Sequence, residues 1–168
     1  MPYMAINLGG VALGVGIIIL FVMRWVMREK RRLGALVPFV LSVLYGMLAA
    51  LAALGSVSAL GGITWVALWA GNVAGYAALV WGIGGNAPDV TRAQQLVLTD
   101  GGYVVVFLIT LVLLGLLKWG PRRANAKIVL GCVAGVLIAL SGNVAGVAAI
   151  PLGSGANLLG SGFTGVFG

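Results

Sequence analysis

Long apolar stretches with almost no charge are the feature that most constrains this chain. Charged residues are 8% of its 168 residues, against roughly 25% in an ordinary soluble domain. A helix needs about 20 mostly apolar residues to cross the hydrocarbon core of a bilayer. The sequence predicts five such hydrophobic segments, at about 5–27, 33–54, 63–83, 103–117 and 128–150. We therefore expect an all-α membrane protein with four or five hydrophobic helices in a single domain, residues 1–168.

Positive charge is concentrated in two connections between these segments. Lys and Arg number 10 against 3 Asp and Glu, which gives a net charge of +7. Such clusters bind anionic lipid head groups, at about 1 kcal/mol per basic residue near the surface. Neither cluster alternates several aromatic residues with basic ones in the way that supports base stacking, so direct contact with nucleic acid is not expected. The predicted lipid- or phosphate-binding residues are Arg28, Lys30, Arg31, Arg32, Lys118, Arg122, Arg123 and Lys127.

These two connections conflict with a five-span topology. Three predicted spans separate them, which puts them on opposite sides of the membrane, whereas the positive-inside rule favours the cytoplasm for both. One interpretation is that residues 60–85 do not cross, which leaves four spans in two hairpins with basic turns. The other is that the second connection breaks the rule because it binds a ligand.

Glycine is the second unusual feature, with 28 of 168 residues. It recurs at four-residue spacing, a pattern that allows membrane helices to approach closely. We expect these glycines to close helix contacts, either within the chain or between copies of it. The predicted helix-packing residues are Gly71, Gly75, Gly131, Gly135, Gly142 and Gly146.

The string Gly-Asn-Val-Ala-Gly occurs at 71–75 and again at 142–146. We interpret the recurrence as an internal duplication of the helices that carry it. Each copy places an amide, Asn72 or Asn143, inside an apolar segment, where lipid offers no polar partner. The two amides either form interhelical hydrogen bonds or line a path at the interface of the repeats.

The residue types argue against catalysis. The chain has no His and one Cys, and its acidic residues, Glu29, Asp89 and Asp100, are scattered. No Asp, Glu, Lys or His lies in the middle of a segment, where ion-coupled transporters usually keep an ionisable group. We predict no enzymatic activity, no catalytic or metal-binding residue and no cofactor, with phospholipid as the molecule that the chain binds.

Residues 103–150 predict a hairpin of an apolar helix, a basic turn and a Gly/Ala/Val-rich helix, and residues 5–54 repeat that plan around 28–32. The layout resembles that of conjugative pilins of type IV secretion systems. Those are small hydrophobic subunits with a basic turn between two helices. The resemblance implies a subunit that polymerises together with phospholipid.

From these features we expect a homo-oligomeric structural subunit of a membrane-embedded complex, conduit or filament, such as one that transfers DNA or other macromolecules. Its partners would be further copies, anionic lipid and other subunits of the complex. Two alternatives stay open: a small-solute channel or facilitator lined by Asn72 and Asn143, and an accessory subunit of a larger complex. The composition is typical of a GC-rich genome, which favours the bacterial cytoplasmic membrane or an assembly derived from it. The uncharged tail, 151–168, is expected to be ordered against its neighbours.

Overall fold

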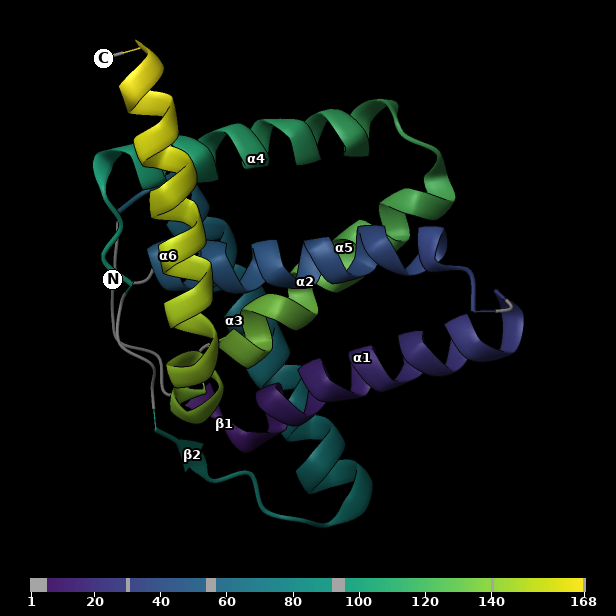
Figure 1. Cartoon of the computed structure of the whole chain (residues 1–168). Helices are drawn as coiled ribbons and strands as arrows, with labels where there is room; N and C mark the ends of the chain where they lie inside the picture. Colours follow the sequence, from purple (N-terminus) through teal and green to yellow (C-terminus); the bar gives the residue numbers. More distant parts are fainter. Residues whose placement is uncertain (1–5, 30, 54–56, 92–95, 140, 168) are drawn as a thin grey trace.

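The computed structural model of the chain describes residues 6–29, 31–53, 57–91, 96–139 and 141–167, without the side chains of 122, 123, 142, 143, 145, 146 and 167. Within these residues the chain is almost entirely helical, and the all-α prediction is confirmed (Figure 1). Two two-residue strands pair with each other. The elements in order are β1 (Ile6–Asn7), α1 (Leu8–Arg28), α2 (Leu33–Ala53), α3 (Ala59–Tyr76), the π-helical turn η1 (Ala77–Gly82), β2 (Asp89–Val90), α4 (Asp100–Trp119), α5 (Arg122–Ala139) and α6 (Gly142–Phe167).

Among the residues that the structure describes, four helical stretches are long and apolar enough to cross a membrane: α1, α2, α3 together with η1, and α4. A shorter apolar helix at Ala124–Ala139 follows. The prediction of four or five hydrophobic helices is therefore confirmed, and it is typical of an integral membrane protein.

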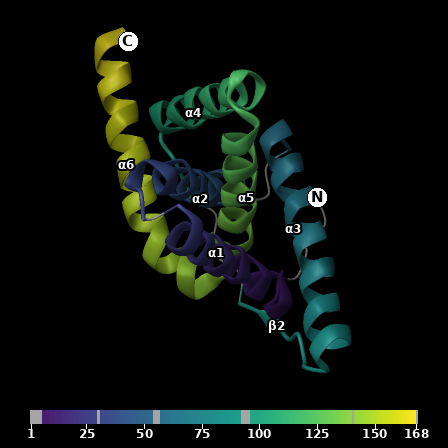
Figure 2. The same ribbon diagram turned by 90° about the vertical axis from the view of Figure 1, so that its right-hand side faces the viewer.

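Two helical hairpins, α1–α2 and α4–α5, form the body of the molecule (Figure 1). Their turns lie at the same end, which we call the basic end. Helices α3 and α6 lie across the hairpins near the opposite end, on opposite flanks, with α2 and α5 between them (Figure 2). The short β1–β2 pairing, with Ile6 opposite Val90, holds the returning segment after η1 against the start of α1.

The central contact of the body joins α2 to α5 and depends on small residues. Ser42 and Gly46 of α2 face Gly131 and Gly135 of α5. A side chain at Gly46 would overlap the backbone of Cys132, and one at Gly135 would overlap the backbone of Val43. The two helices therefore approach backbone to backbone, as small-xxx-small patterns allow.

The segment expected at 128–150 is divided between two helices, because α5 ends at Ala139 and α6 begins at Gly142. Ser141 is buried, and its backbone N–H donates to the carbonyl of Ile138 at 3.1 Å, which closes a tight turn. Ser and Gly are common turn residues, and they supply the break. The tail that follows is helical to Phe167 as part of α6, and Gly160 packs against Gly101 of α4.

The two halves of the chain share one plan. Helices α1, α2 and α3 correspond to α4, α5 and α6, and the halves are arranged about the α2–α5 pair like two objects related by a twofold rotation (Figure 2). In each half, two glycines in the first turn of the first helix pack against the third helix. Gly9 meets Gly75 in the first half, and Gly101 meets Gly160 in the second.

Candidate functional site

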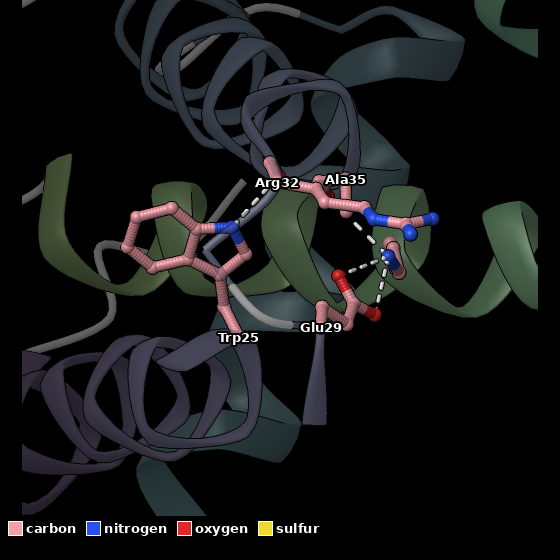
Figure 3. A network of polar contacts seen from close by, with 5 residues as sticks. Trp25, Glu29, Arg32 and Ala35 are labelled. Atoms are coloured by element: carbon pink, nitrogen blue, oxygen red, sulfur yellow. Dashed lines mark hydrogen bonds and ion pairs between the residues drawn. The ribbon is translucent and has the colours of Figure 1, made fainter. Parts of the chain in front are cut away.

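An ion pair joins the two hairpins at the basic end. Lys127, near the start of α5, places its Nζ 2.7 Å from Oε1 of Glu29, which follows α1 (Figure 3). The same ammonium donates to Oε2 of Glu29 at 2.9 Å and to the carbonyl of Ala35 at 3.3 Å. Because these contacts join the two turns directly, the two basic connections lie on one side of the molecule.

A hollow of about 510 Å³ opens beside this ion pair, between α1 and α5. Arg24 and Arg28 stand one turn apart on α1, and both are exposed. Like charges at this spacing repel each other, so an anion between the two guanidinium groups would stabilise the site. Glu29 is the only carboxylate among the lining residues, which are Phe21, Arg24, Arg28, Glu29, Ala126, Lys127 and Leu130.

Aromatic residues make contacts at and near the hollow, and one of them, Phe21, lines it. The rings of Phe21 and Phe39 are stacked, with their centroids 3.7 Å apart. The Nζ atom of Lys127 lies 5.8 Å from the centroid of the Phe21 ring, so a cation–π contact adds to its ion pair. Trp25 donates from Nε1 to the carbonyl of Arg32 at 2.8 Å (Figure 3), which joins the end of α1 to the start of α2.

The predicted lipid-binding residues are distributed over this end. Arg28 and Lys127 line the hollow, whereas Arg31 and Arg32 are exposed on the first turn. Lys118 is exposed on α4, with its Nζ 5.3 Å from the ring centroid of Trp119. Lys30 and the side chains of Arg122 and Arg123 lie outside the described residues. Arg24 was not among the predicted residues, although its spacing of four from Arg28 could have indicated a shared anion site.

The predicted glycine faces lie against helices of the same chain. Gly71 faces Leu137 of α5, and Gly75 faces Gly9 of α1. Gly131 faces Phe39 and Ser42, and Gly135 faces Val43 and Met47. Gly142 and Gly146 begin α6, but their surroundings lie outside the described residues.

Asn72 serves as a clamp at the crossing of α3 and α1. It is buried, with 5% of its surface exposed. The side chain of Asn7 donates to the Asn72 carbonyl at 3.2 Å, and the Asn7 backbone N–H lies 3.4 Å from the Asn72 Oδ1 atom. Asn7 also caps α1 by accepting from the N–H of Gly10 at 2.8 Å.

The structural counterpart of Asn72 in the second half is Asn157, not Asn143. Its Oδ1 atom accepts from the backbone N–H of Thr99 at 2.9 Å and from the Thr99 hydroxyl at 3.1 Å. Thr99 caps α4, as Asn7 caps α1. Sequence reasoning paired the two identical strings and so missed Asn157, while the Asn143 side chain lies outside the described residues. Helices α3 and α6, which carry the strings, do hold equivalent positions in the two halves.

Within the described part of the chain, no three His, Cys, Asp or Glu side chains are grouped so as to hold a metal ion. Comparisons with known protein families, curated proteins and solved structures find no match to this chain.

Proposed function

We propose that the chain is a non-enzymatic structural subunit of a homo-oligomeric, membrane-embedded complex, conduit or filament, and that it holds anionic phospholipid at its basic end. The observation that supports this most directly is the hollow beside Arg24 and Arg28. Two adjacent guanidinium groups line it, and the one carboxylate on its wall is already paired with Lys127. A phosphate diester supplies the negative charge and the acceptor oxygens that such a pair binds.

In this proposal α1, α2 and α4 cross the membrane together with α5, whose 18 residues are about 27 Å long. The stretch of α3 and η1 is also long enough to cross, but here it does not, and both basic turns lie in the cytoplasm of a bacterial cell. Helices α3 and α6 then lie across the outer end. This four-span arrangement satisfies the positive-inside rule for both connections, which a five-span topology does not. The depth of Arg24, one turn before the end of α1, suits a side chain that extends to the head-group region.

Self-assembly is supported by the last part of α6, which extends beyond the body (Figures 1 and 2). Leu158, Leu159 and Val166 are exposed there, and added side chains at Gly162 and Gly165 would meet open space. A second copy of this chain is the occupant that we propose for this surface. The pilin-like layout of the hairpins favours the same role.

The alternative of a small-solute channel gains no support from Asn72, because that side chain is engaged at a helix crossing. An accessory subunit of a larger complex would share the same lipid-binding end.

The test is native mass spectrometry of the purified protein in mild detergent. We expect a discrete homo-oligomer that retains anionic lipid. The double variant Arg24→Gln and Arg28→Gln should lose most of that lipid, whereas the matched pair Arg31→Gln and Arg32→Gln, on the exposed turn, should lose little. A monomer would contradict the assembly, and equal losses in both double variants would contradict the site.

A further inference from the structure

The two halves of the chain differ where the first helix of each hairpin meets the central α2–α5 pair. In the first half, Gly14 of α1 lies against α5: a side chain there would be 2.9 Å from Ile138 Cγ1 and 3.0 Å from Leu137 Cβ. In the second half, the position with the same spacing from the first-turn glycines holds Val106. Val106 is buried and packs with Leu48 and Ala52 of α2. A valine therefore stands where the first half has no side chain, and α4 packs less closely on α2 than α1 packs on α5.

An apolar cavity of about 230 Å³, open on one side, lies between α2, α3, α4 and α5. An apolar cavity of about 150 Å³ is already large enough to bind benzene. Its α4 wall runs from Thr110 to Leu117 and its α5 wall from Ile128 to Val136. At 1.5 Å per residue, each wall is about 10–12 Å long, so the cavity is elongated along the bundle.

The hydroxyl groups in the cavity wall are bonded to protein atoms. Tyr45 and Thr110 share a hydrogen bond of 2.6 Å, and Thr110 also donates to the carbonyl of Val106 at 2.7 Å. Thr64 donates to backbone carbonyls of its own helix at 3.0 Å. Because these groups need no partner from a ligand, the cavity favours an apolar occupant.

One end of the cavity lies beside the second basic turn. Leu117 and Ile128 line it, and the residues between them include Lys118, Arg122 and Arg123, besides Lys127, which is paired with Glu29. An anionic group bound at that turn would place its attached chain at the cavity.

We propose that this cavity holds one acyl chain of an anionic phospholipid whose head group lies at the 118–127 turn. The proposal rests on the proposed function, since it needs a chain that sits in a membrane and collects anionic lipid. It adds a second lipid position, distinct from the hollow between α1 and α5.

The test is cross-linking with phosphatidylglycerol that carries a diazirine in one acyl chain, followed by peptide mapping. We expect adducts on the cavity walls at 110–117 and 128–136. Val133→Phe and Ala67→Leu, which each add bulk to the wall, should lower these adducts several-fold. The matched control Val112→Phe adds the same bulk on the exposed face of α4 and should leave them unchanged.

Adducts spread evenly over the lipid-facing surface would overturn the proposal, as would unchanged adducts in both filled variants. Two further lipid probes distinguish which kind of molecule supplies the acyl chain. A diazirine phosphatidylcholine, which has no net charge, would overturn the role of the basic turn if it labelled the walls equally well. A diazirine fatty acid that labelled the walls more strongly than phosphatidylglycerol would overturn a phospholipid as the source of the chain. Failure here, with anionic lipid still lost on removal of Arg24 and Arg28, would leave the proposed function standing.

Discussion

Lys127 of α5 and Glu29, at the end of the first hairpin's leading helix, form an ion pair of 2.7 Å across 98 positions of sequence. It fixes the relative position of the two hairpins at the end that carries most of the positive charge. Only about a fifth of either side chain is exposed, so water screens the pair incompletely.

Replacing Glu29 with Gln leaves Lys127 without its carboxylate partner and raises the net charge of the hollow's lining by one. We expect stability to fall by about 1 kcal/mol, at the upper end for partly exposed pairs, and retention of anionic lipid to rise. Thermal unfolding in detergent and native mass spectrometry measure the two effects. Asp89→Asn, in the distant β2 strand, is the control. Weaker lipid retention in Glu29→Gln would show that the carboxylate helps to build the site.

The α2–α5 contact should tolerate no side chain at its centre. Gly135→Leu would force the side chain into the backbone of α2, and overpacking of this kind typically costs about 1–3 kcal/mol. Gly16→Leu on α1 is the matched control, because nothing lies within 4 Å of that position. Unfolding titrations in mixed micelles provide the measurement, and equal stabilities would show that the contact is looser than described.

Asn157→Ala should destabilise the crossing of α6 and α4 by about 0.5–1.5 kcal/mol, since it removes the hydrogen bond that Asn157 accepts from the Thr99 N–H. Asn72→Ala should act similarly on the crossing of α3 and α1. Hydrogen exchange at the first turns of α4 and α1 distinguishes the two, because each variant should loosen only its own half. Asn86→Ala, in an exposed segment, should change neither. If either single variant accelerated hydrogen exchange in both halves, the separate role of each asparagine at its own helix crossing would be contradicted.

The four-span topology predicts the sidedness of single cysteines introduced into a Cys132→Ser background. Arg31→Cys and Gly120→Cys should react with a membrane-impermeant thiol reagent from the same side, and Asn86→Cys from the other. Labelling of Arg31→Cys and Gly120→Cys from opposite sides would restore the five-span topology. Val112→Cys, on the apolar face of α4, should react from neither side.

Much of the fold follows from the sequence, because apolar runs and basic turns are local signals. The break between α5 and α6 was missed, because its turn residues, Ser141 and Gly142, are few and lie within a long, mostly apolar segment. Asn157, the counterpart of Asn72 in the second half, was also missed for a physical reason. The connection from Ala53 to Ala59 is longer than that from Ala139 to Gly142, so one fixed offset cannot align both the hairpins and the third helices.

The basic residues at this end were identified from the sequence, their arrangement was not, and their binding of lipid stays a prediction. Basic residues on each turn were visible as charge clusters, whereas the hollow depends on how α1 packs against α5. Arg24 joins the site because its helix face turns toward Lys127, and only the packing of the two helices decides that.

The small-residue faces at the α2–α5 contact carry an evolutionary consequence. Ser42 and Gly46 of α2 meet Gly131 and Gly135 of α5. Each half therefore covers a small-residue surface of the other half that resembles its own. A chain of half this length would leave that surface bare and complementary to a second copy of itself. The present molecule thus has the form of a fused dimer, whose halves differ where Gly14 lies against α5 in the first half and Val106 packs against α2 in the second.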